Sequence, residues 1–349
     1  MDLIISILGY YAVKKSSYFG SVRFFKHLYL TILALLIVVP SVIAVSKSVS
    51  LSKAQRELDE LRQSAPAPES AVIEQNAETG DDSAAQKIAP EGERSAVEIL
   101  DSQPLIAHGL GEVGGKNVLN CLEAFEENYA AGIRVFEVDL RMTSDGHVVL
   151  RHDWRAKMQE GVSETSIPTL EEFLAAPISG KYTPLSFRDL LYLMEQHPDI
   201  CIITDTKFVN EEEVTRQFRA MLDDAYETGL TYLFGRMVIQ IYTPLMFKVA
   251  DHLYHFPYYI FTLYNSDFDG TEDSFRQQAV FCQENGIMGI TMSDYWWTDN
   301  APDYYPIASW RGIRIYVHTV NDADRANSLL ASGVSGIYTD TLLPDDIDR

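Results

Sequence analysis

Residues 104–154 read PLIAHGLGEVGGKNVLNCLEAFEENYAAGIRVFEVDLRMTSDGHVVLRHDW, and the rest of the chain is best understood from this stretch. His108 and His152 stand at the ends of two β-like runs, with Glu137 and Asp139 between them. Alternate residues of a strand share one face, so we expect both carboxylates to point into the same pocket. Paired carboxylates can hold a hard divalent cation, and histidine can move protons near neutral pH.

The composition is that of a globular enzyme. The sequence has 349 residues, of which 46% are hydrophobic, enough for at least one sizeable core. Its formal net charge of −22, without clustered Lys and Arg, excludes a general nucleic-acid binder. The three cysteines, Cys121, Cys201 and Cys282, form no CxxC pair and are odd in number, so neither a zinc cluster nor a disulfide framework is indicated.

An apolar run near the N-terminus predicts a membrane anchor. Residues 28–45, LYLTILALLIVVPSVIAV, carry no charge over 18 positions, close to the ~20 that span a bilayer. We predict one transmembrane helix here, after a short segment 1–27. A cleaved signal peptide is the alternative, although 27 preceding residues are long for one. Four basic residues lie on each side of the span, and we expect a single-pass protein of the cell membrane with its C-terminal domain outside the cytoplasm.

Residues 46–100 have the composition of a spacer. A short polar helix is predicted over 52–62, and 63–100 then carries eight acids against two bases and no aromatic residue. Such a segment cannot bury enough apolar surface to fold and repels itself. We therefore predict a disordered linker that ends at residue 100 and a folded domain over 101–349.

The folded domain shows eight β-rich runs that alternate with helix-like stretches. The runs lie near 104–109, 135–142, 201–207, 237–242, 258–264, 289–293, 313–320 and 336–340. Eight such units in about 250 residues predict a TIM (β/α)8 barrel. Local signals agree, because Asn210 with Glu213 forms a capping pair, Gly229 marks a helix end and Ser144-Asp145-Gly146 reads as a hairpin turn. An open doubly wound sheet is the alternative fold, but no glycine-rich phosphate fingerprint follows the first run.

The motifs of this domain resemble those of the glycerophosphodiester phosphodiesterase family, within the PI-PLC-like phosphodiesterase superfamily. That family's pattern runs His-Arg-Gly, Glu-Asn-Thr, Ala-Phe, Glu-x-Asp, Thr-x-Asp-Gly and His-Asp, and its later signatures are Glu-x-Lys, Trp-Thr-Val-Asn and a closing Thr-Asp. The matching positions are His108, Asn120, Ala124-Phe125, Gly132, Glu137-Val138-Asp139, Thr143, Asp145-Gly146, His152-Asp153, Asp205-Thr206-Lys207, His318-Thr319-Val320-Asn321 and 333–340. The resemblance covers about the last 245 residues.

The resemblance implies a TIM barrel that hydrolyses a small phosphodiester, glycerol- or lipid-derived, with one Mg²⁺ or Ca²⁺. It implies that Glu137, Asp139 and Asp205 hold the metal, and oxygen ligands at strand ends do suit a hard cation. His108 and His152 would then be the general acid and base.

Lys207 shares a strand face with Asp205 and would neutralise a phosphate oxygen.

Three departures from the family pattern bear on the substrate. Gly109 replaces an Arg and removes a bidentate phosphate contact, which Lys116 or the amides of the 109–115 loop could supply. Asp205 replaces a Glu, as in the related sphingomyelinase D branch, and Leu119 replaces an acid. His318 replaces a Trp, so we expect a different pocket for the leaving group.

These departures leave two alternatives open: a sphingomyelinase D-type lyase that forms a cyclic phosphate, and an inactive barrel that binds a phosphorylated polymer.

Overall fold

The computed structural model of this chain describes residues 86–154 and 166–348. The chain divides into two units, Met1–Gly80 and Asp81–Arg349, and every described residue belongs to the second. The predicted transmembrane helix at 28–45 and the polar helix at 52–62 lie outside the described residues. Within the described ranges, no helix is long and apolar enough to cross a membrane.

Eight parallel strands form the centre of the second unit, and they coincide with the eight predicted runs. They are β1 (Leu105–Ala107), β2 (Val135–Met142), β4 (Cys201–Asp205), β5 (Met237–Ile241), β6 (Tyr259–Thr262), β7 (Gly289–Ser293), β8 (Arg314–His318) and β9 (Gly336–Thr339). The order around the sheet is β1-β9-β8-β7-β6-β5-β4-β2, and β1 also pairs with β2. This last pairing closes the sheet into a barrel, which confirms the predicted TIM barrel.

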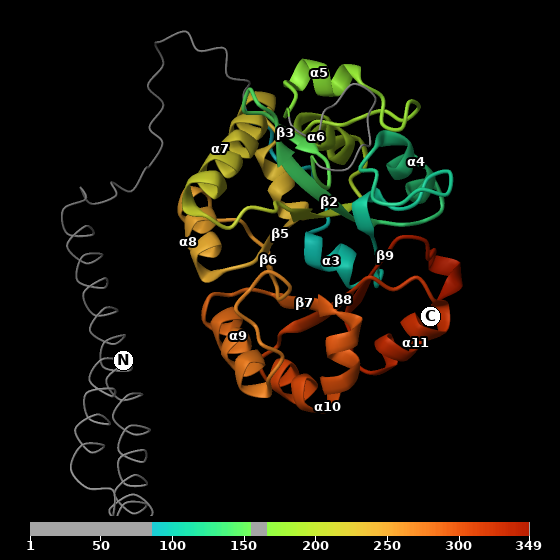
Figure 1. The fold of residues 1–349 in the computed structure, drawn as a ribbon, viewed down its shortest axis with the longest axis vertical. Helices are drawn as coiled ribbons and strands as arrows, with labels where there is room; N and C mark the ends of the chain where they lie inside the picture. Colours follow the sequence, from blue (N-terminus) through green and yellow to red (C-terminus); the bar gives the residue numbers. More distant parts are fainter. Residues whose placement is uncertain (1–85, 155–165, 349) are drawn as a thin grey trace, which may run out of the picture. The chain divides into compact units, whose positions relative to one another are not determined.

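Helices follow the strands and surround the barrel (Figure 1). They are α4 (Leu122–Ala130), α5 (Leu170–Ala175), α6 (Phe187–Gln196), α7 (Glu211–Thr228), α8 (Pro244–Leu253), α9 (Glu272–Glu284), α10 (Asp294–Trp310) and α11 (Ala323–Ala331), with short 3-10 turns η1 (His108–Leu110), η2 (Thr231–Arg236) and η3 (Pro344–Asp346). The predicted caps of α7 are present, because the Asn210 side chain accepts from the Glu213 amide and Gly229 is left-handed, with φ 72°.

A hairpin extends β2 beyond the barrel. Strand β3 (Val148–Leu150) pairs antiparallel with the end of β2, with Leu140 opposite Leu150 and Met142 opposite Val148. The turn at 144–146 contains Gly146 at φ 93°, a backbone conformation that favours glycine. The predicted hairpin is thus confirmed, and it returns the chain to His152 close to where β2 leaves the barrel.

Side chains alternate between the two faces of each strand, and this alternation separates two cores. The core between strands and helices includes Phe136, Val138 and Leu140, all fully buried. The second core fills the barrel interior with the opposite set, including Val135 and Ile203. On β2 the inward face has apolar Val135 at its N-terminal end, followed by the acidic Glu137 and Asp139.

A helix from the predicted linker closes the floor of the barrel. Helix α3 (Ala96–Leu100) inserts Ala96, Ile99 and Leu100 into the interior core, at the N-terminal ends of the strands. Glu93, just before it, forms an ion pair with the buried Arg236, with the Glu93 Oε1 and Arg236 Nε atoms 2.6 Å apart. Residues 86–100 therefore belong to the folded unit, which begins earlier than the predicted boundary at residue 101.

The described C-terminal segment returns to the same floor. Residues Pro344, Ile347 and Asp348 line a surface hollow together with Ser102 to Leu105, at the start of β1. The backbone amide of Asp348 donates to the Asn327 side chain, which fixes the segment beside α11. Both ends of the described unit thus lie at the N-terminal ends of the barrel strands.

Candidate active site

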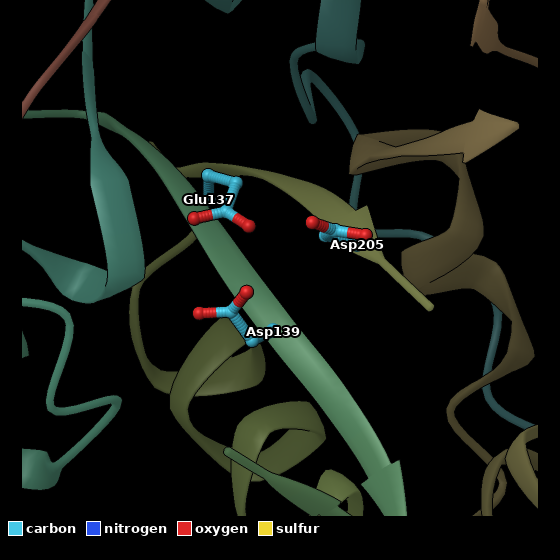
Figure 2. A group of neighbouring side chains, drawn as sticks. All are labelled: Glu137, Asp139 and Asp205. Carbon is cyan, nitrogen blue, oxygen red and sulfur yellow. The ribbon is translucent and has the colours of Figure 1, made fainter. Parts of the chain in front are cut away.

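Three buried carboxylates converge where the barrel portion of β2 and the strand β4 end (Figure 2). Glu137, Asp139 and Asp205 are 2%, 0% and 4% exposed, and one oxygen atom of each lies within 4.8 Å of the others. These are the three residues that the sequence predicted as metal ligands. The structure brings them together as expected.

The strand register explains this convergence. Asp139 pairs directly with Asp205 across the parallel β2 and β4 strands, and Glu137 lies two residues earlier on the same face of β2. Paired residues in adjacent strands are about 5 Å apart and point to the same face of the sheet. The three carboxylates must therefore lie close to one another. The cluster is therefore a direct product of the Glu-x-Asp spacing and the register of β4.

Two groups from the β1–α4 loop hold these carboxylates in place. The Asn120 side chain binds Asp139 twice, donating from Nδ2 to the carboxylate at 2.8 Å and accepting the Asp139 amide at 2.9 Å. The backbone amide of Gly109 donates to Glu137 Oε2 at 2.7 Å. Gly109 has φ 55°, and a Cβ there would lie 2.6 Å from the Cα of Val118. Any side chain at this position, an Arg included, would therefore require the loop to take a different path.

Packing three acids together perturbs their protonation. Burial and the adjacent charge of Asp139 raise the pKa of Glu137 to about 8. Burial also raises the pKa of Asp205, although Lys207 opposes this. For Asp139, burial is outweighed by Lys207 and His152, and its pKa is lowered.

Lys207 lies among the carboxylates. Its Nζ atom is 2.7 Å from Asp139 Oδ1 and also pairs with Asp205 Oδ2, and its side chain is 13% exposed. Burial lowers the pKa of Lys207, but the charges of Asp205, Asp139 and Glu137 outweigh burial and raise it, so the amine stays charged. A cation in this place reduces repulsion between the acids.

Each predicted catalytic histidine has a carboxylate partner. His108 Nδ1 is 2.9 Å from Asp340 Oδ1, and His152 Nδ1 is 2.9 Å from Asp153 Oδ2. With Nδ1 engaged, Nε2 is the atom of each ring that could exchange a proton with a substrate. Burial lowers the pKa of His108, but the Asp340 hydrogen bond and the charges of Glu137 and Asp139 outweigh it and raise the pKa to about 9.

A cavity of about 230 Å³ joins these groups. Its lining combines the predicted catalytic, metal-binding and phosphate-binding positions with residues of the later strands: His108, Glu137, His152, Asp205, Lys207, Gln240, Tyr264, His318, Thr319 and Tyr338. Ligand pockets for drug-sized molecules are usually roughly 300–1,000 Å³, so this cavity suits a small polar group.

His318 lies in this cavity as the sequence predicted. Its ring contacts those of Tyr264 and Tyr338, with centroids 5.5 and 6.3 Å apart. Burial and the charge of His108 lower the pKa of His318 to about 4, so the ring is neutral at physiological pH. Its Nε2 atom has no hydrogen-bond partner within the described part of the chain.

Lys116 is the predicted site residue that the structure leaves outside. It lies on the exposed tip of the loop after β1, where its backbone pairs with Val113, and it is not among the residues that line the cavity. The amides of the 109–115 loop were the other suggested substitute for the missing Arg; among them, that of Gly109 donates to Glu137 and those of Gly111, Glu112 and Val113 donate to backbone carbonyls. The structure therefore does not bring Lys116 to the carboxylates.

Several residues of the site carried no predicted role. Asp340 directly follows β9, the last barrel strand, and its second oxygen accepts from Asn321 at 2.8 Å, so the Asn321 amide and His108 hold it from two sides. Two signals were available for Asp340: it is the Asp of the closing Thr-Asp signature, and a closed barrel places the last strand beside the first. Tyr264 and Gln240 gave no signal in the sequence.

The carboxylate cluster fits a divalent metal. Asp205 Oδ1 is buried without a hydrogen-bond partner in the described ranges, although an orphaned buried oxygen is costly. Three buried acids within 4.8 Å of one another would gain from a further positive charge beside that of Lys207. Oxygen donors are the ligands that Mg²⁺ and Ca²⁺ prefer.

Comparison with known proteins agrees with this chemistry. The model of the glycerophosphoryl diester phosphodiesterase family matches residues 113–343, more than half of the chain. The chain belongs to this family. It is therefore a phosphodiesterase, as the resemblance of its motifs implied.

Solved structures of the family share the fold of this phosphodiesterase. A glycerophosphodiester phosphodiesterase of Parabacteroides distasonis superposes with a TM-score of 0.56 at 18% identity, over 69% of this chain and 93% of that one. A phosphodiesterase of Oleispira antarctica, in complex with the product sn-glycerol-3-phosphate, gives 0.55 at 16% identity, over 71% and 96%. At these identities the similarity establishes the barrel architecture of the phosphodiesterase and not its substrate.

Proposed function

We propose that this phosphodiesterase hydrolyses a glycerophosphodiester, or a related lipid-derived phosphodiester, by acid–base catalysis with His108 and His152. One observation carries the proposal: both histidines and two of the three clustered acids line one small cavity, and the third acid, Asp139, adjoins it. The product bound to the Oleispira antarctica relative is glycerol-based, which supports a substrate of this class.

Glu137, Asp139 and Asp205 would hold one Mg²⁺ or Ca²⁺ ion. Such an ion, when bound, polarises a phosphoryl oxygen and neutralises charge that develops there. Lys207 would add a second positive charge to the same side of the cavity.

The remaining groups would handle the protons. One histidine would take a proton from the attacking water, and the other would give a proton to the leaving oxygen, each through Nε2. Asp340 and Asp153 would keep the two rings in the required orientation and tautomer, because each binds an Nδ1 atom.

We also propose that residues 28–45 anchor the enzyme in the cell membrane as a single span, with the barrel outside the cytoplasm. The support is the uncharged run of 18 residues, and the proposal needs its own test. Protease added to intact cells should remove the barrel from a tagged protein. Complete protection that ends when the cells are lysed would contradict this orientation.

The activity is tested with the full-length protein and a panel of glycerophosphodiesters. The wild type should release glycerol phosphate from at least one of them, and Asp139→Asn should not. Asp324→Asn, on the exposed surface of α11, is the matched control and should leave the rate unchanged.

Phosphorus NMR of the product identifies the reaction. A monoester signal supports hydrolysis, and a cyclic phosphate signal would instead establish the lyase reaction. No turnover of any compound, with or without Mg²⁺ or Ca²⁺, would favour an inactive barrel that binds a phosphorylated polymer.

A further inference from the structure

The hydroxyl of Tyr264 contacts one of the three clustered carboxylates. Tyr264 follows β6 by two residues and lines the cavity. Its hydroxyl donates to Asp205 Oδ2 over 3.0 Å. Asp205 thus receives hydrogen bonds on the same oxygen from Tyr264 and from Lys207, while its Oδ1 atom has no partner in the described part of the chain.

A second tyrosine stands behind the first. The hydroxyls of Tyr242 and Tyr264 are 2.9 Å apart, and Tyr242 is fully buried. A phenol has one hydrogen to donate, and that of Tyr264 is directed to Asp205. Tyr242 must therefore be the donor to Tyr264, which gives the sequence Tyr242 to Tyr264 to Asp205. A hydroxyl that accepts a hydrogen bond becomes a stronger donor itself.

Ring contacts fix the position of Tyr264 on two sides. Its ring meets the edge of Tyr242 at a centroid distance of 5.4 Å and the edge of His318 at 5.5 Å. Both contacts have the perpendicular geometry that aromatic rings prefer. The side chain is 41% exposed, but turning away from Asp205 would break both ring contacts and the hydrogen bond.

Asp205 needs such a support more than its two neighbours do. Asp139 is held by Asn120 and Glu137 by the Gly109 amide, both from the β1–α4 loop, whereas Asp205 lies on the other strand. Lys207 is its other partner, and Lys207 also pairs with Asp139. If the Lys207 side chain moved to bind phosphate, Tyr264 would still donate to Asp205.

We infer that Tyr264, backed by Tyr242, is a positioning residue that fixes the Asp205 carboxylate for divalent metal binding. This inference rests on the proposed function, because it presupposes that the three carboxylates hold a metal. Partners that orient metal ligands commonly change metal affinity 10- to 100-fold when they are removed. Tyr264 acts on Asp205 in this sense, through a single hydrogen bond.

The test is calorimetric titration of Mg²⁺ or Ca²⁺ alone into EDTA-treated, dialysed full-length protein. Tyr264→Phe removes one oxygen atom and should weaken metal binding about tenfold or more relative to wild type. Tyr259→Phe is the matched control, because it removes a hydroxyl from β6, the strand that precedes Tyr264, and the nearest partner of that hydroxyl is Asp251, at 3.4 Å. It should bind metal as the wild type does.

Tyr242→Phe separates positioning from a general loss of packing. It should weaken metal binding by less than Tyr264→Phe, and the double variant should bind as Tyr264→Phe does, because Tyr242 acts through Tyr264. This variant also tests the inference if Tyr264→Phe does not fold.

The outcomes are distinguishable. A wild type that binds metal, with Tyr264→Phe within twofold of it, would overturn the role of Tyr264 and leave the proposed function intact. The role of Tyr242 would be overturned by a double variant clearly weaker than Tyr264→Phe. A wild type that binds neither ion would overturn the proposed metal site itself.

Discussion

Replacement of Glu93 by alanine tests whether the segment before residue 101 is an integral part of the barrel. Glu93 Oε1 accepts from Arg236 Nε at 2.6 Å, and the two side chains are 8% and 2% exposed. The same guanidinium also donates to the carbonyls of His197, Ile200 and Met194. Without Glu93, a buried positive charge would keep its carbonyl partners and lose its counter-ion.

The size of the effect follows from this arrangement. Removing one partner of a buried ion pair typically costs ~3–5 kcal/mol. Since three carbonyls would still bind Arg236, we expect the low end, a loss of about 3 kcal/mol in the free energy of unfolding. In a domain of this size such a loss lowers Tm by roughly 6–12 °C.

Urea unfolding of the full-length protein, followed by tryptophan fluorescence, measures this loss. Glu93→Gln keeps a neutral acceptor and should lose less than Glu93→Ala. Arg276→Ala breaks an exposed pair with Glu272 and should change stability by less than about 1 kcal/mol. If Glu93→Ala is no more destabilising than this surface control, residues 86–100 do not support the barrel and our account of its floor is refuted.

Three further predictions concern the site. His152→Ala should slow cleavage of the wild type's best substrate at least ~100-fold, while His147→Ala, on the exposed hairpin turn, should not; equal rates would exclude His152 from catalysis. EDTA should abolish the activity and Mg²⁺ or Ca²⁺ should restore it, so activity that survives exhaustive chelation would refute the metal site. The pKa of His318 is lowered to about 4 in the folded protein, chiefly by burial, against about 6.5 when unfolded. Between pH 6.5 and 4 the unfolded chain therefore binds a proton that the folded chain does not, and stability should fall by up to about 3 kcal/mol as pH drops. His318→Asn should remove this part of the loss, and urea midpoints of both proteins at pH 7 and pH 4.5 would show it; parallel losses would contradict the assignment.

The barrel and its acidic cluster were predictable because they depend on local rules. Strand alternation fixes which residues share a face, so the spacing of Glu137 and Asp139 is enough to assign both to one pocket. The next predicted barrel strand, 201–207, contains Asp205. Its place in the order of strands put Asp205 beside the other two carboxylates. Parallel neighbours in a closed barrel leave little freedom for such a side chain.

The supporting residues were not predictable in the same way. Asp340 meets His108 only because the barrel closes, across 232 positions of sequence. Tyr264 lies in a loop after β6, and nothing in its local sequence indicates that its hydroxyl reaches Asp205. The path of the Gly109 loop likewise depends on contact with Val118, which a one-dimensional pattern does not contain.

Residues 86–100 were predicted as part of a disordered linker from their composition, although they fold against the barrel. Their acidic, aromatic-free sequence is typical of a spacer, yet three apolar residues of α3 and one buried ion pair dock them firmly. The composition that predicts a spacer is an average over the 38 residues 63–100. A few specific contacts with the barrel are enough to fold part of that segment against it.

The floor of the barrel has a practical consequence. The described chain enters through Gln86 and α3 on that side, and Pro344 to Asp348 lie there too, while the histidines and carboxylates occupy the opposite rim. A tag, a bead or a fused partner attached directly at Gln86 or at Asp348 would lie on the floor side and leave the rim with the histidines and carboxylates facing the solution. Immobilised preparations of this phosphodiesterase should therefore keep the access of substrate that the free enzyme has.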